Sequence, residues 1–572
     1  MPTSANHKLI IYQLLPRLFS NTKTTNKFYG SIAENGCGKF NDITGTALAG
    51  IKELGCTHVW YTGIIEHATM TDYSAHGIRP DDPDVVKGRA GSPYAVKDYY
   101  DVDPDLAVDV PSRMVEFEAL IERTHAQGLK VIIDFIPNHI ARTYQSDAKP
   151  SSARDIGEDD DTNQAFSPKN DFYYLPGQPF VVPQGYNPGG DELDSPLKDG
   201  RFDENPAKAT GDDAFTANPS INNWFETVKL NYGVDYLNGH QTHFSSPPPL
   251  WYKLLDILRF WAAKGIDAFR CDMIEMVPVE FWAWLIPQMK QQFPSLLFIG
   301  EAYQKGQYAN YLFSGQFDYL YDKVGLYDAI KRLIRNEDHA TTWDINAVWN
   351  YDCRGFDERM LRFMENHDEQ RIASHDFAGN AWLAIPGMIV TTTLATGPVM
   401  VYFGQEVGEP ASGAQGFSGA DGRTTIFDYW GVPEHQKWVN GGQFDGGGLS
   451  SEQKQLRNFY CKLLNITAQH EAINQGEFYE LMLANQHSEG FNERVYLYMR
   501  YTPEQRILVV VNFNRFEHHI HVQLPADLLT KFNLSGQVVG TDLLSGTEHN
   551  IADIAQGIPL ALPPVSGVLL KF

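Results

Sequence analysis

A helix, a glycine and an apolar strand follow one another three times in the first half of the chain. The three segments read TGTALAGIKELGCTHVWYTGI, PSRMVEFEALIERTHAQGLKVIIDF and PPLWYKLLDILRFWAAKGIDAFRCD. Each helix is expected to stop at its glycine, namely Gly55, Gly128 and Gly265. The core-facing residues of the second and third helices are predicted to be Phe117, Leu120, Ile121 and Thr124, and Leu254, Ile257, Leu258 and Trp261. This order predicts an α/β fold with a parallel sheet.

Five further strands bring the predicted set to eight. The eight runs are 9–15, 58–62, 131–135, 266–271, 296–300, 317–321, 361–364 and 399–403. Eight units in which strands alternate with helices favour a closed (β/α)8 barrel, a TIM barrel, over an open sheet. The chain also lacks the GxGxxG and GxxxxGK[ST] loops with which open α/β sheets bind phosphates.

The spacing of the third and fourth strands predicts an inserted lobe. One strand–helix–strand unit needs roughly 30 residues, yet Phe135 and Ile266 are separated by about four times that length. The surplus, residues 139–249, is rich in Pro, Gly, Asn and Asp. A lobe inserted after the third strand would lie beside the barrel mouth, where active sites of this fold are found. We interpret the acidic run 158–161 within it as a solvated loop.

A second domain is predicted at the C-terminal end. From about residue 476 the sequence changes to alternating segments such as RVYLYMRY, RILVVVNFN and HHIHVQL, which are typical of antiparallel strands. We therefore expect a barrel built from residues 1–138 and 250–475, the lobe at 139–249, and an antiparallel β-sandwich at 476–572. The last brings no cluster of catalytic residue types, so its expected role is packing.

Charge and cysteine content narrow the function. A net charge of −25 argues against nucleic acid and anionic membranes as partners and favours a neutral substrate. The five cysteines are far apart and form no CxxC pair, which indicates neither a zinc site nor a disulfide framework. No export leader and no membrane-spanning run are visible, so the expected location is the cytoplasm, or outside the cell if a leader has been removed. The oligomeric state is left open.

Three of the strand runs end in an acidic residue. IDAFRCD closes on Asp272, LLFIGE on Glu301 and RFMENHD on Asp368. Cleaving the acetal between two sugars requires a proton for the leaving oxygen and a carboxylate that captures the cationic anomeric carbon. We therefore hypothesise a glycosidase centre, with Asp272 as nucleophile and Glu301 as general acid and then base. Each acid alone has a simpler reading as a helix cap or a structural ion-pair partner.

The neighbours of these acids extend the hypothesis. Arg270 is on the same strand face as Asp272 and is expected to keep its carboxylate ionised. An apolar strand and the nearby Asp272 should raise the pKa of Glu301, so that it holds a proton near neutrality. His367 and Asp368 would grip the hydroxyls of the distorted sugar. This allocation predicts a retaining reaction with the two working carboxyls about 5 Å apart.

Four motifs in order resemble those of the α-amylase superfamily, glycoside hydrolase family 13, and the resemblance covers nearly the whole chain. They are DFIPNH at 134–139, GIDAFRCD at 265–272, GEA at 300–302 and ENHD at 365–368. Supporting matches are IYQLLPRLF, SPYAVKDYYDVDP, KLN at 229–231 and GPVMVYFGQEVG. The resemblance implies the catalytic acids Asp272, Glu301 and Asp368, the sugar-contacting residues Tyr94, His139, Arg270 and His367, and Asp134 as a structural partner of the arginine. It implies no organic cofactor.

Two departures from the family pattern bear on metal and substrate binding. Tyr94 follows GSP, where many amylases have a His before a Gly–Tyr pair, and the first loop, SNTKTTNKFYG, lacks a DxNxDG calcium pattern. Asn138 matches a position that binds calcium in many amylases, so it is the calcium candidate, and calcium is left open. The predicted activity is retaining hydrolysis of α-1,4-linked glucans such as starch, or of maltooligosaccharides. The alternatives are an α-glucan transglycosylase, a sucrose- or maltose-directed relative and a non-catalytic binding or scaffold homologue.

Overall fold

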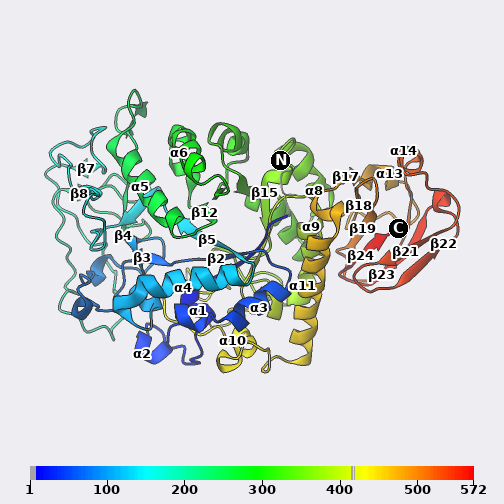
Figure 1. Ribbon diagram of the computed structural model, residues 1–572, viewed down its shortest axis with the longest axis horizontal. Coiled ribbons are helices and arrows are strands. Elements are labelled where there is room, and N and C mark those ends of the chain that lie inside the picture. Colours follow the sequence, from blue (N-terminus) through cyan, green and yellow to red (C-terminus); the bar gives the residue numbers. More distant parts are fainter. Residues whose placement is uncertain (1–7, 414–415, 418) are drawn as a thin grey trace.

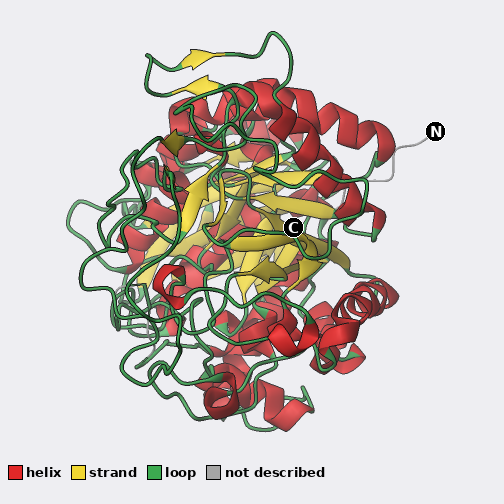
Figure 2. Ribbon diagram, turned by 90° about the vertical axis from the view of Figure 1, so that its left-hand side faces the viewer, coloured by secondary structure: helices red, strands yellow, loops and turns green. Residues whose placement is uncertain are grey.

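The centre of the molecule is a closed barrel of eight parallel strands surrounded by helices (Figures 1 and 2). The computed structural model describes residues 8–413, 416–417 and 419–572. In order around the barrel the strands are β1 (Ile10–Leu14), β2 (His58–Tyr61), β5 (Lys130–Phe135), β12 (Ala268–Cys271), β13 (Leu297–Gly300), β14 (Tyr319–Tyr321), β15 (Met360–Phe363) and β16 (Val399–Tyr402). Every predicted strand overlaps one of them, and the (β/α)8 prediction is confirmed.

Helices cover the outside of the barrel. The longer ones are α3 (Gly45–Glu53), α4 (Arg113–Ala126), α5 (Pro249–Ala263), α6 (Val279–Gln292), α7 (Asp328–Ile334), α9 (Ile385–Thr393) and α11 (Ser451–Gln469). The core-facing residues predicted for α4 and α5 are all buried. Gly55, Gly128 and Gly265 have φ of +99°, +69° and +97°. This left-handed conformation suits glycine best, and it lets the chain leave each helix and turn into the next strand.

The inserted lobe consists mainly of loops with three short strand pairs. Its strands are β6 (His139–Ala141), β7 (Tyr174–Leu175), β8 (Ala207–Lys208), β9 (Thr227–Lys229), β10 (Val234–Asp235) and β11 (Gln241–Thr242). β6 follows the barrel strand β5 and pairs antiparallel with β9, so that His139 lies opposite Lys229. A further hairpin of β3 (Ile65–His67) and β4 (Val96–Val102) follows β2. The pairing of β6 with β9 therefore fixes the lobe directly to the carboxyl end of the barrel.

The C-terminal part forms antiparallel sheets, as predicted. One sheet has the order β17 (Glu477–Glu480), β18 (Val495–Tyr501), β19 (Arg506–Asn512), β24 (Ser566–Lys571), β21 (Val538–Asp542) and β22 (Glu548–Ile551), and β20 (His518–Val522) pairs with β23 (Ile558–Leu562). In Figure 1 these sheets and the lobe strands β7 and β8 lie at opposite ends of the molecule. The helices of the described ranges include none long and apolar enough to cross a membrane.

Candidate active site

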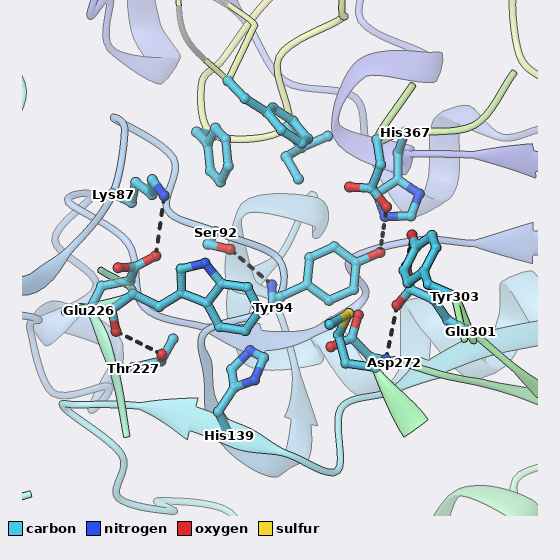
Figure 3. A pocket seen from close by; sticks show the side chains of 16 residues that line it. Lys87, Ser92, Tyr94, His139, Glu226, Thr227, Asp272, Glu301, Tyr303 and His367 are labelled. Atoms are coloured by element: carbon cyan, nitrogen blue, oxygen red, sulfur yellow. Dashed lines mark hydrogen bonds and ion pairs between the residues drawn. The ribbon is translucent and has the colours of Figure 1, made fainter. Parts of the chain in front are cut away.

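A cavity of about 290 Å³ opens at the carboxyl ends of the barrel strands (Figure 3). Three parts of the chain line it: the segments that follow the barrel strands, the end of the lobe near β9, and the segment that follows β16. The lining side chains are Lys87, Ser92, Tyr94, His139, Trp224, Glu226, Thr227, Asp272, Met273, Glu301, Tyr303, His367, Asp368, Phe417, Ile426 and Phe427. Six of the predicted site residues are in this set, and all three predicted acids are among them.

The acids are brought together by the order of the strands. Asp272 follows β12 directly and Glu301 follows β13 directly, and these parallel neighbours are paired in register up to Cys271 and Gly300. Asp368 comes from the segment after β15, and β14 lies between β15 and β13 in the barrel. The side chains of Asp272 and Glu301 are 9% and 3% exposed, whereas that of Asp368 is 29% exposed. Asp368 is therefore the acid most open to a ligand.

Arg270 does not line the cavity, but its guanidinium contacts two of the acids, Asp272 and Glu301. Its Nη1 donates a hydrogen bond of 2.8 Å to Oδ1 of Asp272, and its Nη2 lies 2.7 Å from Oε2 of Glu301. Nη1 is also 3.4 Å from Oδ1 of Asp134, and Nε donates to the hydroxyl of Tyr321. One guanidinium thus faces three buried carboxylates. With Asp368 nearby, the carboxylates outnumber the positive charge, and this imbalance favours proton uptake by the group.

Burial and charge raise the pKa values of the acids. Burial raises the pKa of Glu301, the adjacent Asp272 adds to that shift, and Arg270 opposes it. The pKa of Asp368 is raised well above its usual range, first by burial and then by Glu301. Burial also raises the pKa of Asp272, and the opposing effect of Arg270, which the sequence predicted, is the smaller of the two. A raised pKa at Glu301 is what a general acid needs.

A hydrogen-bonded group holds His367 beside the acids. Gln13 Nε2 lies 2.8 Å from His367 Nδ1, and with the amide as donor the ring proton is on Nε2, where it faces Asp368. Nε2 lies 2.5 Å from the hydroxyl of Tyr94 and 3.1 Å from Oδ2 of Asp368. Burial, reinforced by the nearby Arg270, lowers the pKa of His367 well below its usual range. The ring is therefore neutral and is fixed as a donor toward the cavity.

Asp134 and Tyr94 extend this group. The indole of Trp60 donates to Oδ2 of Asp134 over 2.9 Å, and the hydroxyl of Tyr94 lies 3.4 Å from Oδ1 of the same carboxylate. Burial raises the pKa of Asp134 to about 6. The Tyr94 ring stacks on His367, with the ring centroids 5.2 Å apart. The Asp134 carboxylate thus contacts both Arg270 and Tyr94 and helps to hold them in position.

Asn138, the calcium candidate, does not line the cavity. Its Oδ1 accepts a hydrogen bond of 2.8 Å from the ammonium of Lys229, and its Nδ2 donates to the carbonyl of Gly211. The same ammonium lies 2.5 Å from Oδ1 of Asp213. These residues do not fit a calcium ion at Asn138. An ion bound to Oδ1 of Asn138 would lie beside the buried ammonium of Lys229, which already occupies that oxygen. The described residues contain no group of three or more His, Cys, Asp or Glu able to hold a metal.

His139 lies next to this ammonium and faces the cavity. Burial and the charge of Lys229 lower the pKa of His139 to about 4, so the imidazole is neutral near pH 7. Its ring centroid is 5.2 Å from that of Trp224. His139 can therefore exchange hydrogen bonds with a neutral ligand without adding a positive charge.

Several lining residues were missed by the sequence analysis. Tyr303 is two residues after Glu301, and its hydroxyl donates to Oε1 of that acid over 2.7 Å. The lobe contributes Trp224 and Glu226, and the Glu226 carboxylate lies 3.7 Å from the ammonium of Lys87. Figure 3 shows this pair on the opposite side of the cavity from Tyr303, Glu301 and Asp272. A tryptophan and a glutamate just before the KLN motif were a usable signal, while Lys87 carried none.

Comparison with known proteins identifies the family of this chain. The model of the α-amylase catalytic domain matches residues 13–425. The chain is 22% identical to α-amylase 3 of Dictyoglomus thermophilum, with 95% of this chain and 92% of that protein covered, and 22% identical to neopullulanase 2 of Thermoactinomyces vulgaris, with 98% and 77% covered. The solved α-amylase of Geobacillus thermoleovorans, in complex with acarbose, superimposes with a TM-score of 0.62 at 18% identity over 99% of this chain and 98% of that chain. The protein therefore belongs to the α-amylase family of glycoside hydrolases.

Proposed function

We propose that the protein is a retaining hydrolase that cleaves α-1,4-linked glucans or maltooligosaccharides by double displacement. The single observation that carries this proposal is the position of Arg270, which contacts Asp272 at 2.8 Å and Glu301 at 2.7 Å. A nucleophile and a proton donor held by one guanidinium are kept at a fixed separation. Retaining enzymes need a separation of about 5 Å, too short to leave room for a water between nucleophile and sugar.

In the first step Asp272 attacks the anomeric carbon. A new bond forms between that carbon and a carboxylate oxygen of Asp272, while the glycosidic bond breaks and its electron pair passes to the leaving oxygen. Glu301 donates its proton to this oxygen, so the leaving sugar departs as a neutral alcohol. The raised pKa of Glu301 supports this role, because the carboxyl must still hold a proton when substrate binds.

In the second step water releases the sugar. Glu301, now ionised, takes a proton from the water, and the water oxygen bonds to the anomeric carbon. The ester bond to Asp272 breaks, and both carboxyls return to their starting states. Two inversions give a product with the α configuration of the substrate. No organic cofactor takes part in this scheme.

Asp368 and His367 are assigned to the sugar hydroxyls. Asp368 is the most exposed of the three acids, and His367 presents its Nε2 proton beside it at 3.1 Å. An acceptor and a donor this close can bind two neighbouring hydroxyls of one ring. Such bonds stabilise the transition state if they strengthen as the sugar flattens.

Transfer of the sugar to another glucan is the alternative reaction. Both reactions share the intermediate on Asp272 and differ only in whether water or a sugar hydroxyl attacks it. Trp224, Phe417, Ile426 and Phe427 give the cavity an apolar wall. Aromatic faces bind sugar rings and displace water, and this wall is the observation that favours transfer. Sucrose and maltose are the small substrates to compare with the polymer.

Product analysis tests the proposal. The protein is incubated separately with starch, maltooligosaccharides, cyclodextrin, pullulan and sucrose, and the anomer released first is identified by proton NMR. We expect shortened α-glucans with the α configuration. Products longer than the starting oligosaccharide would favour transfer, and release of the β anomer would refute double displacement. No turnover of any of these α-glucosides would leave only a non-catalytic family member.

A further inference from the structure

The two oxygens of Glu301 have different surroundings. Oε2 accepts a hydrogen bond of 2.9 Å from the backbone N–H of Met273 and lies 2.7 Å from Nη2 of Arg270. Oε1 accepts a hydrogen bond of 2.7 Å from the hydroxyl of Tyr303. Both partners of Oε2 are obligatory donors, whereas a phenolic hydroxyl can donate or accept. A proton bound by Glu301 is therefore carried by Oε1, next to Tyr303.

The backbone conformation of Met273 directs its N–H toward Glu301. This residue follows Asp272 and has a φ of +41°. This left-handed conformation is unfavourable in free energy for any residue that has a side chain. Its N–H reaches Oε2 of Glu301 from this position. The segment after Asp272 thus fixes one edge of the Glu301 carboxylate, and the position of Oε1 depends on the contact on the other edge.

Tyr303 is itself held in place by Glu275. Oε2 of Glu275 accepts from the backbone N–H of Tyr303 over 2.8 Å, and its Oε1 accepts from the N–H of Gln304 over 2.9 Å. Glu275 belongs to the short helical turn Ile274–Met276 that follows Met273. The segments after β12 and β13 are consequently tied together, and Tyr303 is oriented by the segment that also carries Asp272.

We propose that Tyr303 is a positioning residue for proton transfer, which holds Oε1 of Glu301 in line with the leaving oxygen, and that Glu275 fixes Tyr303 for this task. The hydroxyl donates to Oε1 when Glu301 is ionised, and it accepts from the protonated carboxyl until substrate binds, when that proton turns to the leaving oxygen. The same contact therefore orients the carboxyl in both halves of the reaction. This inference rests on the proposed function, because it assigns Tyr303 to the acid and base step of that reaction.

The test uses substrates that differ in their need for the proton. Aryl α-maltosides with leaving groups from phenol to 2,4-dinitrophenol are hydrolysed by wild type, Tyr303→Phe and the control Tyr311→Phe. Tyr311 lies in the segment that follows Tyr303, and its hydroxyl donates a hydrogen bond of 3.2 Å to the carbonyl of Val277. Removing the Tyr311 hydroxyl leaves the hydrogen bond between Tyr303 and Glu301 intact. For Tyr303→Phe we expect kcat/KM to fall about tenfold on the phenyl substrate and less than about twofold on the dinitrophenyl one, part of the 10²–10⁴ that a positioned acid contributes.

The pH profile gives a second readout. The Tyr303 hydroxyl bonds the ionised form of Glu301 and so lowers the pKa of that acid. Its removal should move the basic limb of kcat/KM to higher pH, a change that simple loosening of the fold does not predict. Glu275→Gln, which loses an acceptor for one of the two N–H groups, should show the same dependence on leaving group in weaker form. This second variant keeps the proposal testable if Tyr303→Phe does not fold.

Two results would overturn the inference. Equal losses on all aryl maltosides would make Tyr303 a merely structural residue, and wild-type values on all of them would remove any role. If the wild-type protein hydrolyses none of the aryl maltosides, the proposed function itself is wrong, and the role of Tyr303 falls with it. The Tyr311→Phe protein is expected to follow wild type on each substrate.

Discussion

Arg270 is a single positive charge that faces the buried carboxylates of Asp134, Asp272 and Glu301. A lysine at this position would keep the charge but lose the planar fork that reaches two acids at once. We therefore predict that Arg270→Lys lowers kcat/KM by at least about tenfold, as steady-state kinetics would measure. The control is Arg259→Lys, which alters an exposed pair with Asp256 on the outer helix α5. Wild-type kcat/KM in Arg270→Lys would contradict the role given to the guanidinium.

The raised pKa values predict the pH dependence of activity. Asp272 must be ionised to attack, so activity is lost as pH falls through its pKa, and burial places this acidic limb above the usual 3.9 or so of aspartate. Glu301 must hold a proton, so activity is lost as pH rises through its pKa. Burial and Asp272 place this basic limb above the usual 4.3 or so of glutamate. A kcat/KM profile whose basic limb lies at about 4.3 would be inconsistent with this environment.

The strand pattern of the sequence predicted that the acids meet at the barrel mouth, whereas Tyr94 and His139 were predicted from the family resemblance. Asp272 and Glu301 end their strands, and parallel pairing alone makes them neighbours. Gln13 was missed, although a buried glutamine within the apolar strand IIYQL was a usable signal. The contact of Tyr303 with Glu301 depends on Glu275, and the conformation of that loop follows from packing that no local pattern records.

At the scale of elements, Lys229 joins the lobe to the barrel. It is on β9, and its buried ammonium contacts Asn138, just before β6, and Asp213 within the lobe. Lys229→Met would leave Oδ1 of Asn138 without its donor, and we predict a loss of about 1–3 kcal/mol of unfolding free energy. Denaturant unfolding measures this loss. The control Lys264→Met removes a partly exposed pair with Glu118 on the outer helices.

The same ammonium predicts how the protein responds to calcium. With Lys229 present, the melting temperature should be the same in EDTA and in excess calcium, because the ammonium already neutralises the oxygens at this junction. In Lys229→Met, calcium should restore part of the lost stability by taking the freed position. A wild-type melting temperature that falls in EDTA and recovers with calcium would contradict this account.

Elements with a strong periodic pattern were predictable and the lobe was not. The strands of the barrel are mostly apolar runs, and β2, β5 and β12 each follow a helix that ends at a glycine, so their positions follow from the sequence. The lobe strands β7 to β11 are two or three residues long. Their pairing joins residues as distant as His139 and Lys229, so it depends on tertiary contacts and not on local propensity.

For the whole molecule, the C-terminal sheets complete the core beside α9. All nine residues of α9 are buried, and Arg500 of β18 donates to the carbonyl of Leu394 over 3.1 Å and to that of Ala472 over 3.2 Å. We predict that a chain shortened to residues 1–475 exposes this apolar helix and aggregates, as sedimentation of expressed protein would report. Arg500→Met is the milder variant and should lower the melting temperature. A soluble, active 1–475 fragment would show that the sheets are dispensable.

The account as a whole depends on a covalent sugar on Asp272. The most direct measurement is to incubate the protein with a 5-fluoro-α-glucosyl fluoride, quench with acid, digest and identify the modified peptide by mass spectrometry. We expect the mass of one fluorosugar on Asp272, and Glu301→Gln should accumulate the adduct because its release needs the base. A sugar attached to any other residue, or turnover of this substrate with release of the β anomer and no adduct, would contradict the account.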